Sequence, residues 1–303
     1  MLLQVFYFLI SIVGLYFGAE ISLESSERVG KSWKMSPLLI GMFIVGFGTS
    51  LPEFFVSQLA CYRGLPEMAL GNIIGSNIAN TFLVLGVSAL LYALGLESKE
   101  LKKQFGFHLV LSVIIACVFY STKVSPITSL IMAIFFIFYF YINFRGEKEV
   151  IEEEIDVSKF DYLKIIIGFT LLYGAGELLV YSGANIGRMW GISEFAISAI
   201  FVAFGTSFPE LVTALVASYR KKDADIIIGN VIGSNIFNGA FVLGSIGFYN
   251  FQTSSRYSYE LAALVSVSIL FMAMSYLKIR INKKVSVVFL AVYSYFVYYW
   301  LKA

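Results

Sequence analysis

The sequence contains few charged residues. Only 14% of its 303 residues are Asp, Glu, Lys or Arg, whereas 58% are hydrophobic and 17% are aromatic. Soluble proteins average about 25% charged residues, so this chain lacks the charge needed to solvate a folded surface in water. It has two cysteines, Cys61 and Cys117, without metal-ligand spacing. No basic cluster lies on a soluble segment, which argues against nucleic acid as a partner. The composition indicates a protein whose surroundings are the lipid bilayer.

Apolar stretches of about 20 residues recur along the whole chain, and this is the length that crosses a hydrocarbon core. We therefore expect an all-α polytopic membrane protein with ten transmembrane helices. The first stretch lacks a basic n-region and a cleavage site, so we interpret it as a retained helix. The predicted spans are 2–22, 37–62, 68–95, 105–121, 125–143, 161–181, 195–219, 225–249, 257–277 and 285–301.

The basic residues predict the orientation. With the N-terminus outside, 17 of the 22 Lys and Arg residues fall on the cytoplasmic side, as the positive-inside rule requires. We expect a multi-pass protein of the cell membrane with both termini extracellular. Its single transmembrane domain divides into a first five-helix half, 1–143, an acidic cytoplasmic linker, 144–160, and a second five-helix half, 161–303. The sequence is compatible with a monomer but does not state the oligomeric state.

The two halves contain an internal repeat. GFGTSLPE at 46–53 recurs as AFGTSFPE at 203–210, and 71–86 matches 229–244 at 11 of 16 positions. Five predicted spans separate equivalent points, and because five is odd, the second copy crosses the membrane in the opposite sense. Inverted-topology repeats are typical of transporters, with the substrate site at the repeat interface near mid-membrane.

Each repeat places Gly-Thr-Ser-x-Pro-Glu within an apolar span. Pro52 and Pro209 lack an N–H group and crowd the preceding turn, so we expect the second and seventh helices to be broken there. Lipid does not tolerate the freed carbonyls unless they face protein or a water-lined cavity. A hard cation would satisfy them. The expected donors are the carbonyls of Gly46, Thr49, Ala203 and Thr206, together with the hydroxyls of Ser50 and Ser207.

Glu53 and Glu210 lie near the middle of their spans, and no Lys or Arg lies at a similar depth. A central carboxylate is costly unless it is protonated, paired or bound to a cation. The cation-bound state is the functional interpretation, and a protonated glutamate hydrogen-bonded in a helical core is the structural alternative.

The third and eighth predicted spans contribute Gly-Ser-Asn-Ile-x-Asn. On a helix, Ser76 shares a face with Asn80, and Ser234 shares one with Asn238. These faces serve either ion coordination or polar contacts between helices. Asn77 and Asn235 point elsewhere, and we expect them to form interhelical hydrogen bonds. The glycines of this segment should let it approach the broken helix closely.

The pooled ligands are all oxygen, which suits calcium and sodium and argues against zinc or copper. The transported ions are therefore expected to be calcium and sodium, without a cofactor. Two glutamates balance one divalent ion, and sodium ions are the alternative occupants. Glu20 and Glu177 also match between the repeats; we expect both near cytoplasmic span ends in a structural role. His108, the only histidine, is expected at the interface without a partner.

The paired GTSLPE/GTSFPE and GSNIAN/GSNIFN segments resemble the two alpha-repeats of the sodium/calcium exchanger family, in its compact prokaryotic form, over essentially the whole chain. The resemblance implies clustered cation sites and exchange of sodium for calcium by alternating access, through sliding of the first and sixth helices. Glu53 and Glu210 would be the central calcium ligands. The full implied set is Glu53, Glu210, Asn80, Asn238, Thr49, Thr206, Ser50, Ser207, Ser76, Ser234, Gly46 and Ala203.

The chain departs from the family pattern at Asn238, where the second repeat often has Asp. This leaves the coupling ion open, and a calcium/proton antiporter is the alternative, because two buried glutamates could carry protons. A cation channel is disfavoured, since channels usually repeat around an axis normal to the membrane. An enzyme is not expected, because the sequence offers no catalytic constellation at membrane depth.

Overall fold

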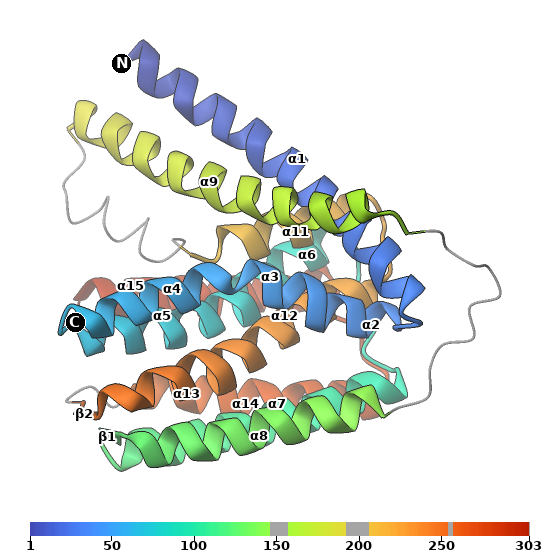
Figure 1. Ribbon diagram of the computed structural model, residues 1–303, viewed down its shortest axis with the longest axis vertical. Coiled ribbons are helices and arrows are strands. Elements are labelled where there is room, and N and C mark those ends of the chain that lie inside the picture. Colours follow the sequence, from blue (N-terminus) through green and yellow to red (C-terminus); the bar gives the residue numbers. More distant parts are fainter. Residues whose placement is uncertain (146–156, 192–205, 254–256, 303) are drawn as a thin grey trace.

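The computed structural model describes residues 1–145, 157–191, 206–253 and 257–302 (Figure 1). These ranges are helical almost throughout, with one short antiparallel pairing of β1 with β2. The elements are α1 (Leu2–Ser32), α2 (Pro37–Ile40), the π-helix η1 (Gly41–Val45), α3 (Gly46–Thr49), α4 (Leu51–Tyr62), α5 (Pro66–Ile78), the π-helix η2 (Ala79–Val84), α6 (Leu85–Leu91), α7 (Lys99–Tyr120), β1 (Lys123–Val124), α8 (Pro126–Phe144), α9 (Lys159–Met189), α11 (Phe208–Tyr219), α12 (Ala224–Ile236), the π-helix η3 (Phe237–Val242), α13 (Leu243–Ile246), the 3-10 turn η4 (Gly247–Tyr249), β2 (Phe251–Gln252), α14 (Ser258–Tyr276) and α15 (Lys283–Lys302).

Most of the long helices have the length and composition of membrane spans, but α15, which corresponds to the predicted span 285–301, is not among them. In the described part of the chain, seven continuous helical stretches are long and apolar enough to cross a bilayer. An eighth consists of Pro37–Thr49 and Leu51–Tyr62, which meet at a bend of 40°. The predicted span 195–219 begins outside the described residues, and only the 12-residue α11 represents it. The chain is therefore an all-helical polytopic membrane protein, and the count of ten spans stays a prediction.

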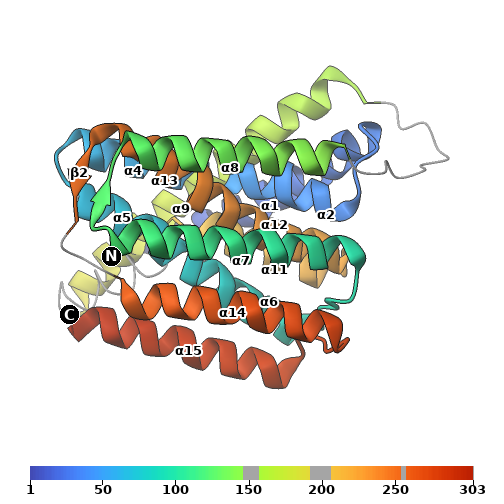
Figure 2. The same ribbon diagram turned by 90° about the horizontal axis from the view of Figure 1, so that it is seen from below.

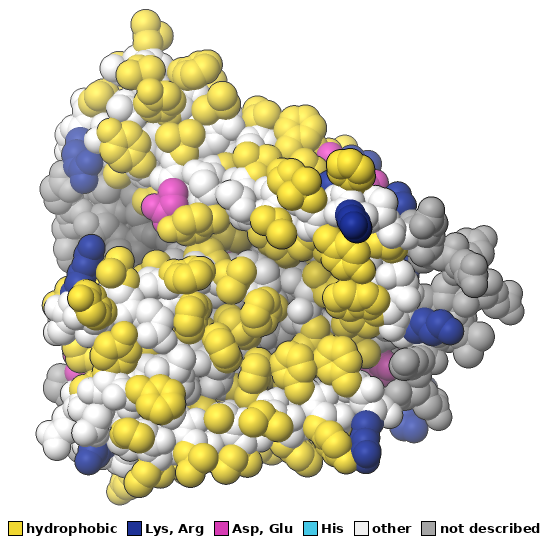
Figure 3. Space-filling view, viewed as in Figure 1, with side chains coloured by type: hydrophobic (Ala, Val, Ile, Leu, Met, Phe, Trp, Pro, Cys, Tyr) yellow, Lys and Arg dark blue, Asp and Glu magenta, His cyan; other side chains and the backbone are white. Residues whose placement is uncertain are grey.

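The surface fits this assignment. On the face shown in Figure 3, Lys and Arg side chains gather at the left and right edges, and hydrophobic side chains cover much of the region between them. Large exposed apolar side chains include Phe6, Phe55 and Ile137. Such side chains are stable in contact with lipid tails, so the band between the charged edges is the part that the bilayer surrounds.

Two continuous helical stretches form the centre of the molecule. In the apolar windows of 66–91 and 224–249, 83% and 94% of the residues are buried, compared with 22% in α1 and 28% in α9. Figure 1 shows α1 and α9 side by side along one edge, and Figure 2 shows α7, α8, α14 and α15 running alongside one another elsewhere. The centre is thus built from the two segments that carry the repeated Gly-Ser-Asn sequence.

The repeated sequences form the same local structures. The helices α4 and α11 have 12 residues each, α5 and α12 have 13 each, and η2 and η3 have six each. Glycine permits the expected close packing in the second repeat only, because a Cβ atom on Gly75 would meet nothing within 4 Å and one on Gly71 only the Tyr257 hydroxyl at 3.6 Å. A Cβ atom on Gly229 would lie 2.5 Å from the Leu38 carbonyl oxygen, and one on Gly233 would lie 2.5 Å from the Met42 Cα. Only glycine fits at these positions, so α12 lies directly against α2 and η1.

The helices α1 and α9 cross in contact. A Cβ atom on Gly18 would lie 2.8 Å from the Leu172 nitrogen, and one on Gly168 would lie 2.7 Å from the Ser22 nitrogen. Residue numbers rise along α1 as they fall along the facing side of α9, so the two helices are antiparallel. The absence of side chains at the crossing lets the backbones approach, and α1 and α9 therefore form a tightly joined pair.

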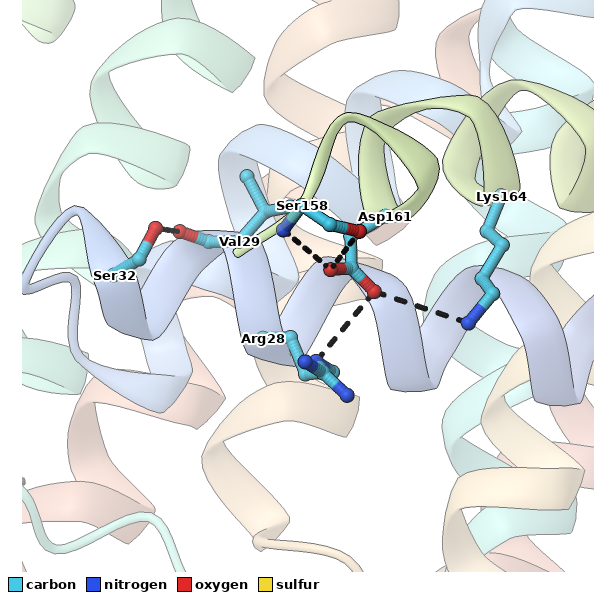
Figure 4. A network of polar contacts seen from close by, with 6 residues as sticks. All are labelled: Arg28, Val29, Ser32, Ser158, Asp161 and Lys164. Carbon is cyan, nitrogen blue, oxygen red and sulfur yellow. Dashed lines mark hydrogen bonds and ion pairs between the residues drawn. The ribbon is translucent and has the colours of Figure 1, made fainter. Parts of the chain in front are cut away.

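One ion pair joins the same two helices at one end, and a second lies within α9 (Figure 4). Asp161, in the first turn of α9, accepts hydrogen bonds from the Ser158 N–H (2.9 Å) and hydroxyl (3.2 Å). Its other oxygen lies 3.5 Å from Arg28 Nε of α1 and 3.9 Å from Lys164 Nζ. This buried carboxylate connects the beginning of α9 to the last third of α1.

Candidate functional site

Both central glutamates lie at the start of a helix. Glu53 is in the first turn of α4 and Glu210 is in the first turn of α11, and each follows a proline at the N-terminus of its helix. Proline is favoured there because its missing N–H has no intrahelical partner in the first turn. The helix dipole places partial positive charge at this end, which favours a carboxylate. The Pro-Glu sequence thus both begins the helix and holds an acid in place.

The two carboxylates are fully buried and nearly without partners. Within the described residues, neither Glu53 oxygen accepts a hydrogen bond, and Glu210 accepts only one, from the Ser50 hydroxyl at 3.0 Å. In the described part of the chain, no Lys or Arg forms an ion pair with either glutamate. The two groups are close enough to interact electrostatically. An uncompensated buried charge costs several kcal/mol, so this arrangement suits a bound cation or proton.

Hydroxyls and one carbonyl from both halves meet beside Glu210. Thr49 Oγ1 lies 3.5 Å from Ser234 Oγ, and the Ser234 hydroxyl donates to the Gly46 carbonyl oxygen at 3.1 Å. Thr49 also donates to this carbonyl at 3.3 Å. The Gly46 carbonyl is not freed by the break: it accepts the Ser50 backbone N–H at 3.2 Å as well as the two hydroxyls, so its role as an ion ligand stays a prediction.

An equivalent pair lies beside Glu53. Ser76 Oγ and Thr206 Oγ1 are 3.2 Å apart. This pair is the counterpart of Ser234 and Thr49, because in each pair one half of the chain supplies the serine and the other half supplies the threonine. Both hydroxyls lie next to Glu53 but make no hydrogen bond of normal geometry to it. Ser207 is buried at the N-terminus of α11. Ala203 lies outside the described residues, so its carbonyl stays a prediction.

The two asparagines occupy π-helical turns. Asn80 lies in η2 and Asn238 in η3; both are fully buried, and their side-chain oxygens and nitrogens have no hydrogen-bond partner in the described part of the chain. η2 packs against α11, and η3 packs against α4. Each asparagine segment therefore lies next to the glutamate-bearing helix of the other half. π-helical turns are often found at functional sites, and unpaired buried amides are rare, so these groups suit ion ligands.

Two further asparagines, Asn72 and Asn230, form hydrogen bonds with residues of the candidate site, and the sequence interpretation missed them. Asn72 donates to the Glu53 carbonyl oxygen (3.2 Å) and to Ser57 Oγ (3.0 Å), and it accepts from Thr206 Oγ1 (3.0 Å). Asn230 accepts from Thr49 Oγ1 at 3.3 Å and donates to Thr213 Oγ1 at 3.3 Å. These residues lie one turn before Ser76 and Ser234, and their i, i+4, i+8 spacing with Asn80 and Asn238 could have identified them.

His108 is not at the interface, so that expectation was wrong. It is 2% exposed, its Nδ1 lies 2.7 Å from Ser268 Oγ, and Asn235 Nδ2 lies 3.2 Å from its Nε2. The Ser268 hydroxyl already donates to the Leu264 carbonyl at 2.6 Å. Nδ1 therefore carries the hydrogen and Nε2 accepts. His108 joins α7 to α14 and α12, a role that its apolar sequence neighbours do not indicate.

The expectation for Asn77 and Asn235 was confirmed. The Asn77 amide donates to the Asn235 carbonyl oxygen at 3.5 Å, and the Asn235 amide donates to Thr81 Oγ1 at 2.8 Å. Both residues join the two central helical stretches rather than face the glutamates. In the described part of the chain, no group of three or more His, Cys, Asp or Glu side chains could hold a metal ion. The site thus has two carboxylates and otherwise neutral oxygens.

Known proteins share this fold. A solved structure of the sodium-calcium exchanger NCX_Mj, soaked with sodium and strontium, superposes with a TM-score of 0.84 at 32% identity, covering 98% of each chain. An uncharacterized membrane protein of Methanocaldococcus jannaschii, MJ0091, is 35% identical over 300 residues, 97% of this chain and 96% of that protein. The sodium/calcium exchanger MaX1 of Methanosarcina acetivorans is 27% identical over 292 residues, covering 80% and 83%.

The fold and the buried oxygen cluster define a membrane antiporter of cations. The sequence profile described as sodium/calcium exchanger protein matches residues 3–145 and 161–302, both halves of the chain. This chain belongs to the sodium/calcium exchanger family. A weaker match is the Ca(2+)/H(+) antiporter ChaA of Bacillus subtilis, 24% identical over 274 residues, covering 79% and 76%.

Proposed function

We propose that the protein exchanges sodium for calcium across the cell membrane, with Glu53 and Glu210 as the central ligands. The observation that carries this proposal is the pair of fully buried carboxylates surrounded by hydroxyl, amide and carbonyl oxygens. Two negative charges neutralise one calcium ion or two sodium ions. Oxygen ligands suit both ions, so the two can compete for the same cluster.

The proposed ligand set is the one expected from sequence. It comprises Glu53, Glu210, Asn80, Asn238, Thr49, Thr206, Ser50, Ser207, Ser76, Ser234, Gly46 and Ala203. A single chain supplies all of them, so a monomer suffices for transport.

The proposed architecture is ten spans in two inverted five-helix halves, 1–143 and 161–303, joined by a cytoplasmic linker, with both termini outside. Two observations support the duplication. The repeated helices have equal lengths, and equivalent residues of the two halves occupy equivalent positions in the site. Alternating access then opens the cluster to one face at a time.

Calcium/proton exchange is the second candidate, favoured by the match to ChaA and by the two buried acids. The two candidates are separated by calcium uptake into proteoliposomes, driven in turn by a sodium gradient and by a proton gradient. We expect uptake with sodium inside the vesicles and none with a proton gradient alone. Uptake that requires a proton gradient and ignores sodium would establish the second candidate.

A further inference from the structure

Two matched sets of polar residues lie outside the ion cluster. Tyr16, Glu20 and Arg220 form the first set, here called the Arg220 corner, and Tyr173, Glu177 and Arg63 form the second, the Arg63 corner. Each residue of one corner is offset by 157 positions from its counterpart in the other, which is the offset of the repeat itself. The tyrosine and the acid lie on α1 or α9, and the arginine directly follows α4 or α11.

The two corners differ in their contacts. Arg220 Nη2 donates to Glu20 Oε1 in an ion pair and to the Tyr16 hydroxyl at 3.1 Å. Arg63 and Glu177 are both exposed, and among the residues that the structure describes neither makes a hydrogen bond or an ion pair. Equivalent sequences thus have one corner closed and the other open.

The packing around the corners shows the same difference. α1 packs directly against α11. Between α9 and the α3–α4 segment lies a cavity of about 680 Å³, lined by Tyr173 and by apolar residues such as Phe55 and Phe169. Tyr173 therefore faces open space where its counterpart Tyr16 contacts an arginine.

The corners lie at opposite ends of the molecule. Just beyond Arg63, Glu67 accepts a hydrogen bond from Thr253 at 3.0 Å, next to β2 and hence near the end of α7. Just beyond Arg220, Ala224 and Asp225 line a small pocket with Glu97 and Ser98, directly before α7 begins. α7 has 22 residues, about 33 Å of helix. The two corners therefore face opposite sides of the membrane.

This placement corrects the expectation that Glu20 and Glu177 lie on the same side. Because α1 and α9 are antiparallel and cross at Gly18 and Gly168, the two acids lie on opposite sides of the crossing. The crossing and the Arg28–Asp161 ion pair join α1 and α9 into one body. A movement of this body that brings Glu177 to Arg63 must carry Glu20 away from Arg220.

We infer that the Glu20–Arg220 and Glu177–Arg63 ion pairs alternate during transport, so that each forms as the other breaks and each holds one membrane face closed. This inference rests on the proposed function, because it assigns the two corners to the two states of alternating access. The residues act on the exposure of the ion cluster and not on the ions themselves, so they are positioning residues.

The Arg220 corner has one additional contact. Lys222 Nζ lies 2.8 Å from Glu27 Oε2, whereas the position equivalent to Glu27 is Ala184. The second ion pair therefore has no counterpart at the Arg63 corner, and it biases the protein toward the state in which the Arg220 corner is closed.

The test measures the two corners with matched spin labels. In a Cys61→Ser/Cys117→Ser background reconstituted in lipid nanodiscs, one label pair replaces Tyr62 and Tyr181 at the Arg63 corner. The equivalent pair replaces Tyr219 and Glu24 at the Arg220 corner, and all four side chains are exposed. Electron–electron distance distributions then give the populations of the two states.

Arg220→Ala should lengthen the 24–219 distance and shorten the 62–181 distance, and Arg63→Ala should shift the populations in the opposite direction. An exposed ion pair changes an equilibrium constant about two- to five-fold, so we expect shifts of this size. The exchange Glu20→Arg/Arg220→Glu should restore the wild-type populations, which a merely structural loss would not do.

Shifts in the same direction in both variants, or no shift in either, would overturn the inference. The distances report conformation alone, so sodium-driven calcium flux is measured separately on the wild-type protein. Opposite shifts without such flux would support the alternation and refute the proposed exchange. Normal flux with unshifted populations would refute the alternation and leave the exchange standing.

Discussion

Replacing Glu53 by glutamine removes one of the two buried charges while keeping the size of the side chain. At an effective dielectric constant of about 20 and a separation of about 4 Å, a carboxylate attracts a divalent ion by about 8 kcal/mol and a monovalent ion by about 4 kcal/mol. If cheaper burial of the neutral amide offsets half of the loss for calcium, about 4 kcal/mol remains. This corresponds to a roughly thousand-fold loss of calcium affinity.

Calcium transport by Glu53→Gln should therefore fall to background, and Glu210→Gln should behave alike because both glutamates are fully buried at equivalent positions. The assay is calcium flux in proteoliposomes, with monodisperse elution in detergent as the folding control and Glu24→Gln, at an exposed position on α1, as the matched charge control. A well-folded Glu53→Gln protein that transports calcium at nearly the wild-type rate would exclude Glu53 from the site.

Three further outcomes follow from the structure. Asn238→Asp adds a third acid beside the cluster, so low pH should inhibit transport more strongly than in the wild type; an unchanged pH profile would mean that residue 238 is not a ligand. Asn72→Ala removes hydrogen bonds to Thr206, to Ser57 and to the Glu53 carbonyl, which should lower the apparent calcium affinity about five- to 100-fold; unchanged calcium dependence of flux would show that Asn72 does not position the site. Gly18→Val places atoms against the backbone of Leu172, and the melting temperature should fall by an amount equivalent to about 1–3 kcal/mol; an unchanged melting temperature would contradict the tight α1–α9 crossing.

The sequence was sufficient to predict the helical membrane fold and the family, because lipid restricts a spanning chain to a few solutions and the duplicated motifs are specific. It also identified the buried glutamates, since an acid in an apolar span is costly and therefore conspicuous. Asn72 and Asn230 were missed because the interpretation stopped at the Ser-Asn pairs and did not follow the same helical face back by one turn.

The errors came from contacts between distant segments. His108 lies close to one end of its predicted span, so the sequence favours an interfacial position. Its partners, Asn235 and Ser268, are 127 and 160 residues away, and sequence periodicity carries no information about them. Glu20 and Glu177 were placed on one side because the antiparallel crossing of α1 and α9 was not considered, although the inverted repeat implies it.

The measurement that tests the central claim most directly counts sodium efflux and calcium uptake in the same proteoliposomes. The vesicles are loaded with sodium, and pH is equal on both sides with a protonophore present. Sodium should leave only when calcium is present outside, calcium should accumulate as sodium leaves, and both fluxes should disappear together in Glu53→Gln. Calcium uptake without sodium efflux would contradict sodium/calcium exchange by this cluster.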